Sequence, residues 1–172
     1  MKYFVLMFLF VSASGLLAGD VEQRLKDLGV ELLPAQKPIA NYVHAVKTGN
    51  LVFLAGHGPL KTDGTYVVGK VGQDLSLEQG REAARLTAIA LLSSLKQAIG
   101  DLDKVTRIVK LNGMVNCTAD FVYQPQVING CSDLLVEVFG EEIGKHARAA
   151  VGMISLPLNT TVEIEMIVEV AD

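Results

Sequence analysis

The sequence predicts an α+β fold in which one mixed β-sheet carries two helices on a single face. Three observations support this prediction. Residues 162–170 alternate between apolar and mostly acidic side chains, as a half-buried strand does. Residues 76–99 and 125–140 carry apolar side chains at near-helical spacing. The elements follow in the order hairpin, helix, strand, helix and two strands, an order that suits one sheet with helices packed on one side.

The composition favours one acidic globular domain. At 172 residues, half of them hydrophobic, the chain is long enough for a substantial core. The formal net charge is −4, and the sequence holds no basic run. Proteins that bind nucleic acid concentrate lysine and arginine on one surface. We therefore expect no nucleic-acid partner.

The N-terminal residues differ in character from the rest. One lysine precedes an apolar run from Tyr3 to Val11, and small residues follow it. The run is too short to span a bilayer and suits a secretory signal peptide, although no clean A-x-A site occurs. We expect residues 1–19 to be a signal peptide or an N-terminal extension, and residues 20–172 to form the domain. A cleaved leader predicts an exported protein, periplasmic or secreted, without membrane contact, and an uncleaved one predicts a cytoplasmic protein.

The first third of the domain predicts a short helix and a hairpin. Residues 21–28 place their leucines and a valine on one helical face. Residues 41–56 contain two apolar runs joined by a Gly-Asn turn signal at 47–50, a pattern typical of a β-hairpin. Residues 58–72 are expected to form a loop with a short strand at 66–68.

The two long helices have clear start and stop signals. Ser76 and Gln79 form a capping-box pattern, and Gly100 ends the periodic segment that follows. Pro125 opens the second helix, which is expected to end near Gly140. The remaining strands are expected at residues 105–115, 147–156 and 162–170.

The face of the sheet opposite the helices also needs a cover. Leu51 and Phe53 are apolar and alternate with Val52 and Leu54, so both sides of their strand are apolar. Two helices cover one face only. Copies of the same chain are the simplest cover for the other face, so we expect a homo-oligomer.

Arg148 lies in an apolar strand whose two faces are both expected to be covered. An arginine in such a place needs an anionic partner, because an unpaired buried charge is costly. The carboxylates of the last strand, Glu163, Glu165 and Glu169, share one strand face. They either face water or meet Arg148 at a subunit seam. The seam would then hold a salt-bridge network or a ligand pocket.

The cysteines and histidines give no sign of a metal site. Cys117 and Cys131 have no metal-type spacing and are expected to be buried small hydrophobes, with a disulfide as the alternative in an exported protein. His44, His57 and His146 also lack ligand spacing. We expect neither a metal nor another cofactor.

The motifs resemble those of the YjgF/RidA family, also labelled L-PSP endoribonuclease. The resemblance is carried by R-x-x-V at 148–151, LP at 156–157 and VEIE at 162–165, and by the blocks PIANYVHAVKTGNLVFLAGHGP and INGCSDLLVEVFG. It extends over residues 38–170. It implies a chorismate-mutase-like fold and a homotrimer whose three sheets form a central barrel. Ligand clefts are then expected between the subunits.

The resemblance also implies roles for single residues. Arg148 matches the arginine that grips the substrate carboxylate, and Glu163 matches the glutamate that positions a water molecule. Gly56 and Asn129 match further cleft residues. Tyr42 matches a cleft residue that is expected to come from the neighbouring subunit.

Two positions depart from the best-known members of the family. Ala55 stands where these deaminases have a serine, and Ala150 stands where they have a cysteine. Ala150 stays in the expected binding set through its backbone, because its methyl group cannot form a hydrogen bond. The segment LVEVFGEEIGKHARAAVG is similar to a less characterised branch of the family.

The implied reaction is hydrolysis of a short-lived 2-imino acid to a 2-oxo acid and ammonia. Arginine suits the carboxylate because its planar fork binds it bidentately. A carboxylate in a partly dry cleft can share the proton of the attacking water. The alternatives are a non-catalytic protein that binds small carboxylates and an Arg148–Glu163 ion pair that binds nothing. A ribonuclease has the weakest support, because the chain is acidic and shows no catalytic histidine pair.

Overall fold

The computed structural model describes residues 20–35, 37–38 and 40–171. The signal peptide or extension expected at residues 1–19 lies outside this part of the chain, so its cleavage and the export of the protein stay predictions. No helix within the described ranges is long and apolar enough to cross a membrane.

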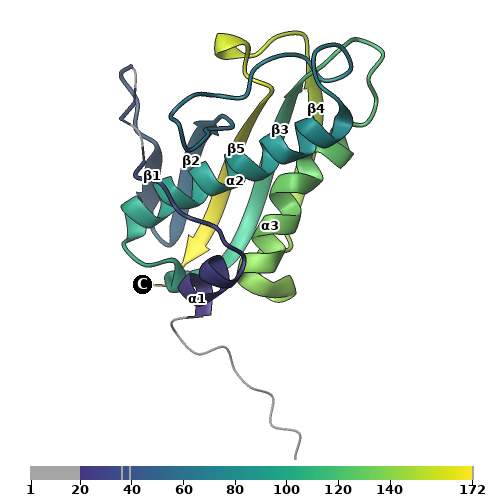
Figure 1. Ribbon diagram of the computed structural model, residues 1–172. Helices are drawn as coiled ribbons and strands as arrows, with labels where there is room; N and C mark the ends of the chain where they lie inside the picture. The colour runs from purple at the N-terminus through teal and green to yellow at the C-terminus, as the bar shows by residue number, and fades with distance from the viewer. Residues whose placement is uncertain (1–19, 36, 39, 172) are drawn as a thin grey trace, which may run out of the picture.

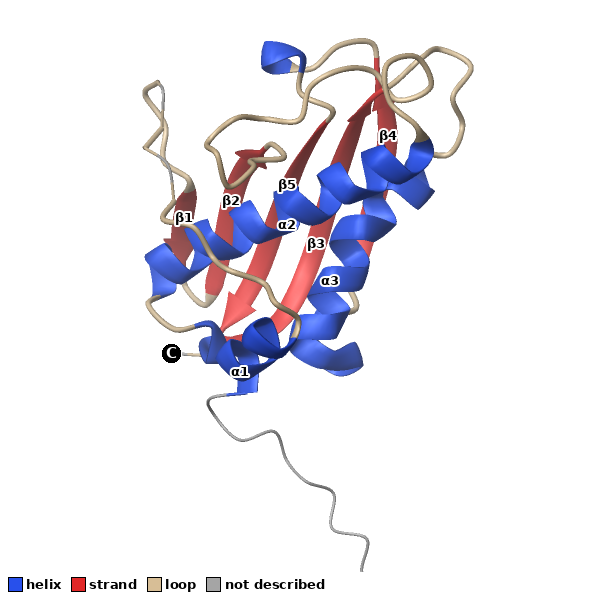
Figure 2. Ribbon diagram, in the orientation of Figure 1, coloured by secondary structure: helices blue, strands red, loops and turns tan. Residues whose placement is uncertain are grey.

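The described residues form one five-stranded sheet in the order β1-β2-β5-β3-β4. The β3–β4 pair is parallel and the other pairs are antiparallel, so the sheet is mixed as predicted. Figures 1 and 2 show α2 and α3 side by side across the same face of the sheet, with α1 at its lower end. The strands are β1 (Ala45–Thr48), β2 (Leu51–His57), β3 (Val105–Asn116), β4 (Ala147–Met153) and β5 (Val162–Val170). The helices are α1 (Asp20–Asp27), α2 (Leu77–Ile99) and α3 (Gln124–Gly144), with short 3-10 turns at Leu102–Lys104 and Pro157–Asn159.

The boundaries of α2 confirm the capping prediction. Ser76 Oγ accepts a hydrogen bond from the Gln79 backbone N–H, and the Ser76 N–H donates to Gln79 Oε1. These two bonds give hydrogen-bond acceptors to the backbone N–H groups of Ser76 and Gln79, which have no partner within the helix. Gly100 ends the helix at a φ of 83°, which a glycine adopts without strain.

The core lies between the sheet and the two long helices. Alternate side chains of β5 are buried beneath the helix layer, as the period of two predicts. Buried leucines of α2 and α3 complete this layer. The buried side chains of β5 are Val162, Ile164, Met166, Val168 and Val170.

Several element ends differ from the sequence-based expectation. β1 begins at Ala45 rather than at residue 41, and the chain before it forms a loop. Residues 66–68 form only isolated bridges, because the neighbouring loop does not supply a continuous partner strand. α3 continues beyond Gly140 although this residue interrupts its geometry with a φ of 79°. β4 ends at Met153, three residues earlier than predicted.

The sheet face opposite the helices is open in a single subunit. Phe53 of β2 and Val46, its partner on β1, are both exposed, and Val151 and Met153 of β4 are exposed on the same face. The expected two-sided covering of β4 therefore does not arise within one chain. A monomer would leave this apolar face in water.

The two cysteines are buried and unbonded. Cys117 lies just after β3 and Cys131 lies in α3, and no disulfide joins them. Burial raises the pKa of the Cys131 thiol, although the nearby Arg148 opposes this shift. The prediction of buried small hydrophobes is confirmed, and the alternative of a disulfide is wrong.

Candidate functional site

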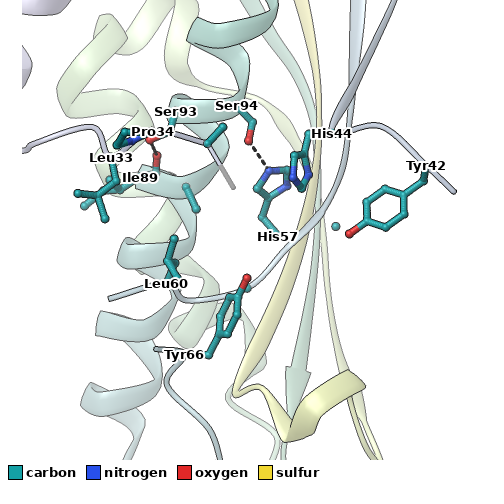
Figure 3. A pocket seen from close by; sticks show the side chains of 14 residues that line it. Leu33, Pro34, Tyr42, His44, His57, Leu60, Tyr66, Ile89, Ser93 and Ser94 are labelled. Carbon is teal, nitrogen blue, oxygen red and sulfur yellow. Dashed lines mark hydrogen bonds between the residues drawn. The ribbon is translucent and has the colours of Figure 1, made fainter. Parts of the chain in front are cut away.

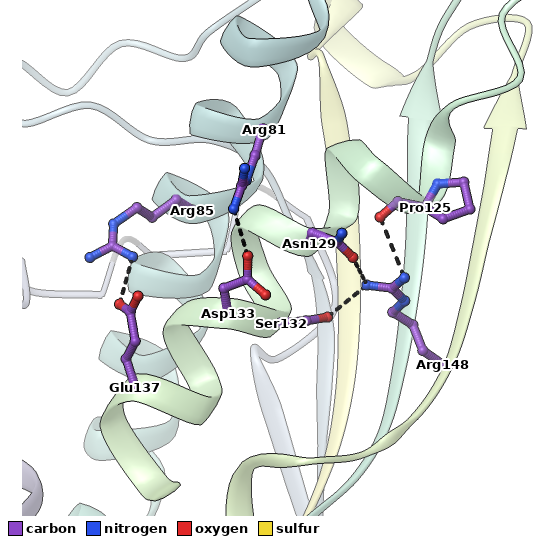
Figure 4. A network of polar contacts seen from close by, with 8 residues as sticks. All are labelled: Arg81, Arg85, Pro125, Asn129, Ser132, Asp133, Glu137 and Arg148. Atoms are coloured by element: carbon purple, nitrogen blue, oxygen red, sulfur yellow. Dashed lines mark hydrogen bonds and ion pairs between the residues drawn. The ribbon is translucent and has the colours of Figure 1, made fainter. Parts of the chain in front are cut away.

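Arg148 is held by the first turns of α3. Its Nη1 donates to Asn129 Oδ1 at 2.8 Å and to Ser132 Oγ at 2.9 Å, and its Nη2 donates to the Pro125 carbonyl at 3.4 Å (Figure 4). The structure therefore brings together Arg148 and Asn129, two of the predicted site residues. Ser132 was not predicted, although it lies three residues after Asn129 and hence on the same helical face.

The groups that orient Arg148 are all neutral. Across residues 20–35, 37–38 and 40–171, no ion pair joins its guanidinium to a carboxylate. Figure 4 shows the contrast with Arg81 and Arg85 of α2, which pair with Asp133 and Glu137 of α3 at 2.8 and 3.0 Å. The half-buried Arg148 thus carries a positive charge that its own neighbours do not neutralise.

The remaining N–H groups of Arg148 suit a carboxylate. Within the part of the chain that the structure describes, the three hydrogen bonds leave the Nε–H and one N–H of Nη2 unused. These two donors form the side-on fork with which arginine binds a carboxylate bidentately. We call Arg148, Asn129, Ser132 and the Pro125 carbonyl the arginine half-site.

Glu163 lies on the open face of the sheet, against Gly56. A methyl group added at Gly56 would overlap Glu163 Oε1, so the glycine makes room for the carboxylate. Burial raises the pKa of Glu163, and the charge of Glu165 raises it further. Glu165 itself is exposed and accepts a hydrogen bond from Asn112. We call Glu163, Gly56 and the nearby Tyr42 the glutamate half-site.

The two half-sites cannot meet within one chain. Arg148 pairs with Leu111 in the sheet register and points to the helices, because Leu111 is buried there. Glu163 pairs with Met114, farther along β3, and belongs to the opposite face. Ala150 shares the helix-facing side with Arg148 and packs against the core. No Arg148–Glu163 ion pair forms among the described residues.

A small cavity adjoins the glutamate half-site. Tyr42 and Gly56 line it together with His44, His57 and Ser94, and its volume is about 80 Å³ (Figure 3). The rings of His44 and His57 lie 5.0 Å apart, and Tyr42 meets His44 edge-on at 5.8 Å. Tyr42 is 44% exposed, which leaves it accessible to a neighbouring subunit.

His57 is fixed from both sides of its ring. Nδ1 lies 2.7 Å from the Ala55 carbonyl, and Nε2 lies 2.7 Å from Ser94 Oγ. Burial lowers the pKa of His57, the Ala55 carbonyl opposes this shift, and His44 lowers the pKa further. His57 is therefore neutral at pH 7. No short-range sequence pattern predicts this contact, because His57 and Ser94 lie 37 positions apart.

The lowered pKa of His57 predicts a loss of stability in weak acid. The unfolded chain binds a proton at its ordinary pKa of 6.5, whereas the folded chain resists protonation until a lower pH. The contribution of His57 to the stability of the fold is thus fully present above pH 6.5 and falls as the pH drops below this value. His57→Gln should reduce this pH dependence, measured as melting temperature from about pH 7.5 to pH 5. Identical pH dependence in the two proteins would contradict the assignment.

His146 provides a comparison for this measurement. Burial also lowers its pKa, the Gly144 carbonyl opposes the shift, and the charge of Arg148 lowers the pKa further. His57→Gln should therefore remove part of the pH dependence and leave the contribution of His146 in place.

Within the described residues, no group of three or more histidine, cysteine, aspartate or glutamate side chains is arranged to hold a metal ion.

Residues 22–170 match the family model described as "YjgF/chorismate mutase-like, putative endoribonuclease". The chain is 42% identical over 152 residues to protein TCP17 of Trypanosoma cruzi. The match covers 88% of this chain and 95% of that protein. It is also 33% identical over 135 residues to a RutC family protein of Pyrococcus abyssi. This match covers 77% of this chain and 89% of the relative.

Solved structures show the same fold. A protein of unknown function from Agrobacterium tumefaciens superimposes with a TM-score of 0.81 at 45% identity, over 88% of this chain and 94% of that one. A Shewanella oneidensis protein described as a "putative endoribonuclease" gives a TM-score of 0.84 at 30% identity, over 88% of this chain and all of that one.

Proposed function

We propose, from the premise that this chain belongs to the YjgF/chorismate mutase-like family, that it hydrolyses reactive 2-imino acids to 2-oxo acids and ammonia. The proposal rests on one observation, the hydrogen-bonding environment of the Arg148 guanidinium. Its guanidinium is oriented by Asn129, Ser132 and the Pro125 carbonyl, all neutral, and it keeps a two-donor fork for an anion. A small carboxylate is the ligand that this fork fits.

The site is proposed to lie between subunits of a homotrimer. The arginine and glutamate half-sites lie on opposite faces of the sheet, so one ligand reaches both only where two subunits meet. The exposed apolar face of the sheet supports such an assembly, with the three sheets forming a central barrel. Tyr42 and Glu163 would then come from one subunit and Arg148 from its neighbour.

In the proposed reaction the arginine half-site binds the substrate and the glutamate half-site transfers protons. Arg148 holds the substrate carboxylate and thereby fixes the imine carbon. Glu163 accepts a proton from a water molecule as the water oxygen bonds to that carbon, and returns the proton to the nitrogen. Glu163 next takes the proton of the new hydroxyl group and passes it to the nitrogen as the carbon–nitrogen bond breaks and the carbonyl forms, so ammonia and the 2-oxo acid leave. A raised pKa makes the Glu163 carboxylate a better base than an ordinary glutamate.

A non-catalytic carboxylate-binding protein is the second candidate. Ala55 and Ala150 favour it, because neither supplies the side-chain hydrogen bond of the serine and cysteine that the resemblance leads one to expect at these positions. Arg148 would hold a carboxylate in the same way, but the site would not accelerate hydrolysis.

One coupled assay separates these candidates. An amino acid oxidase generates imino acids, and their decay is followed with and without this protein. Faster decay supports the enzyme. Binding of pyruvate in calorimetric titration, without faster decay, supports the binding protein. A protein that does neither would contradict both.

Substitution on the open sheet face should disrupt the proposed trimer. Phe53 is 41% exposed and lines a groove of about 550 Å³ with Val46 and Ile167. A lysine at Phe53 would place a charge in the buried interface, so Phe53→Lys should yield smaller species. Leu28→Lys, an exposed leucine just after α1, serves as the control. Light scattering should give three times the subunit mass for wild type and control, and a monomeric wild type would refute the assembly.

A further inference from the structure

A chain of hydrogen bonds joins Arg148 to the backbone at the end of α3. Arg148 Nη1 donates to Ser132 Oγ at 2.9 Å (Figure 4), and Ser132 Oγ lies 3.1 Å from Nε2 of His146. On the other side of its ring, Nδ1 of His146 lies 2.7 Å from the Gly144 carbonyl. His146 directly precedes β4, so the arginine half-site is connected to a residue outside it.

The direction of each hydrogen bond follows from the Gly144 carbonyl. A carbonyl oxygen only accepts, so Nδ1 of His146 carries a proton and donates to it. Burial lowers the pKa of His146, the Gly144 carbonyl opposes this shift, and the charge of Arg148 lowers the pKa further, so the ring is neutral at pH 7. Nε2 is then an acceptor, and the Ser132 hydroxyl donates to it. The lone pairs of Ser132 remain for Arg148.

The carbonyl at the start of this chain belongs to tightly packed backbone. Gly144 is buried, and a methyl group added there would lie 2.6 Å from the Leu135 carbonyl oxygen and 2.8 Å from the Val136 Cα. The end of α3 therefore lies directly against an earlier part of the same helix. The position of the Gly144 carbonyl is fixed by this packing, and the orientation of the His146 ring is fixed by the carbonyl.

Ser132 differs from the other buried or half-buried hydroxyl groups of the long helices that bond within their own helix. Thr87 and Ser93 of α2 each donate to the backbone carbonyl four residues earlier, at 2.9 Å. The same arrangement would direct the Ser132 hydroxyl to the Ile128 carbonyl. Ser132 instead contacts His146 and Arg148. The acceptor on the His146 ring thus decides where the hydroxyl proton lies.

We propose that His146 is a positioning residue, which turns the Ser132 hydroxyl so that its lone pairs hold Arg148 with the free fork aimed at a substrate carboxylate. The proposal rests on the proposed function, which assigns the carboxylate to Arg148. His146 acts through Ser132 and does not touch the substrate. Because Arg148 holds the carboxylate in the substrate and in the transition state alike, a loss of positioning should raise KM and leave kcat nearly unchanged.

Two substitutions of His146 separate its acceptor from its bulk. His146→Leu fills space but offers no acceptor, so it should weaken pyruvate binding about threefold to tenfold, the effect of one hydrogen bond. His146→Gln can place its amide oxygen near the position of Nε2 and should bind within about twofold of the wild type. Calorimetric titration measures the affinities, the coupled imine assay gives KM and kcat, and thermal melts show that both variants fold. Equal affinities of the two variants would overturn the proposal.

A double-mutant cycle tests whether His146 acts through Ser132. Ser132→Ala should weaken pyruvate binding about as much as His146→Leu, and the double variant should bind no more weakly than Ser132→Ala alone. Losses that multiply in the double variant would show an independent role for His146 and overturn the proposal. Ser93→Ala is the matched control, because Ser93 bonds only to its own helix, and it should keep the wild-type affinity.

NMR of the protein without ligand separates this proposal from the proposed function. In ¹⁵N-labelled wild type, His146 should show the Nδ1–H tautomer, and the Nη1 protons of Arg148 should exchange slowly with water. His146→Leu should speed this exchange and His146→Gln should not, while the protons of Arg81, paired with Asp133, serve as the internal reference. Unchanged exchange in His146→Leu overturns the positioning role even if pyruvate binds. If the wild type binds no pyruvate, the proposed function fails, and faster exchange in His146→Leu still supports His146 as the residue that orients Arg148.

Discussion

Replacing Arg148 with lysine is expected to weaken pyruvate binding by about tenfold to a hundredfold while the melting temperature stays near that of the wild type. Lysine keeps the positive charge but loses the planar fork that binds a carboxylate bidentately. Stability should change little, because Asn129 and Ser132 are neutral and water can replace the lost donors. Calorimetric titration and thermal melts of the same samples measure both quantities.

Arg81→Lys is the matched control for this measurement. Arg81 is also an arginine bound to α3, but its partner is the Asp133 carboxylate, and the pair lies on the outer surface of the helices. Its substitution should leave pyruvate affinity unchanged. An Arg148 variant that loses the proposed trimer before it loses pyruvate binding would show a structural role instead. Arg148→Ala should abolish binding altogether while the subunits still assemble.

Glu163→Gln is expected to lower the rate of imine hydrolysis by about a hundredfold or more and to leave pyruvate binding largely intact. The amide keeps the shape of the side chain but cannot accept the proton of the attacking water. The variant should be at least as stable as the wild type at neutral pH, because it removes a carboxylate whose pKa is raised by burial. The coupled imine assay and thermal melts measure the two effects.

Two further variants sharpen the assignment of Glu163. Glu165→Gln changes the next carboxylate on the same strand face, which is exposed and bonded to Asn112, and it should retain the wild-type rate. Gly56→Ala displaces the Glu163 carboxylate without removing it, so it should fold and lose rate. Equal rates in Glu163→Gln and the wild type would exclude Glu163 as the base.

The elements with strong local signals could be predicted from the sequence. The cap of α2 rests on residues three positions apart, and the buried face of β5 follows from its period of two. The start of β1 could not be predicted, because residues 41–44 are apolar enough for a strand but lack a continuous pairing partner. Whether these residues pair depends on the position of β2, which is set by the arrangement of all five strands.

The candidate site was predicted in part. Asn129 contacts Arg148, and Gly56 lies against Glu163. All four residues were expected to line the cleft. The expectation that Arg148 needs an anionic partner within a covered strand is not met in one chain, since its partners are neutral and β4 is open on one face. The contact of His57 with Ser94 joins a strand to the middle of a helix, so no short-range pattern in the sequence reveals it.

The separation of Arg148 and Glu163 on opposite sheet faces has a genetic consequence. In the proposed trimer each cleft takes its arginine from one subunit and its glutamate from another. Two alleles that each encode an inactive chain, one defective at Arg148 and the other at Glu163, would then complement each other when expressed together. Random mixing would pair an intact arginine with an intact glutamate in about a quarter of the clefts. If each cleft instead took both residues from one chain, the two alleles would not complement each other, so co-expression distinguishes a shared cleft from one contained in a single subunit.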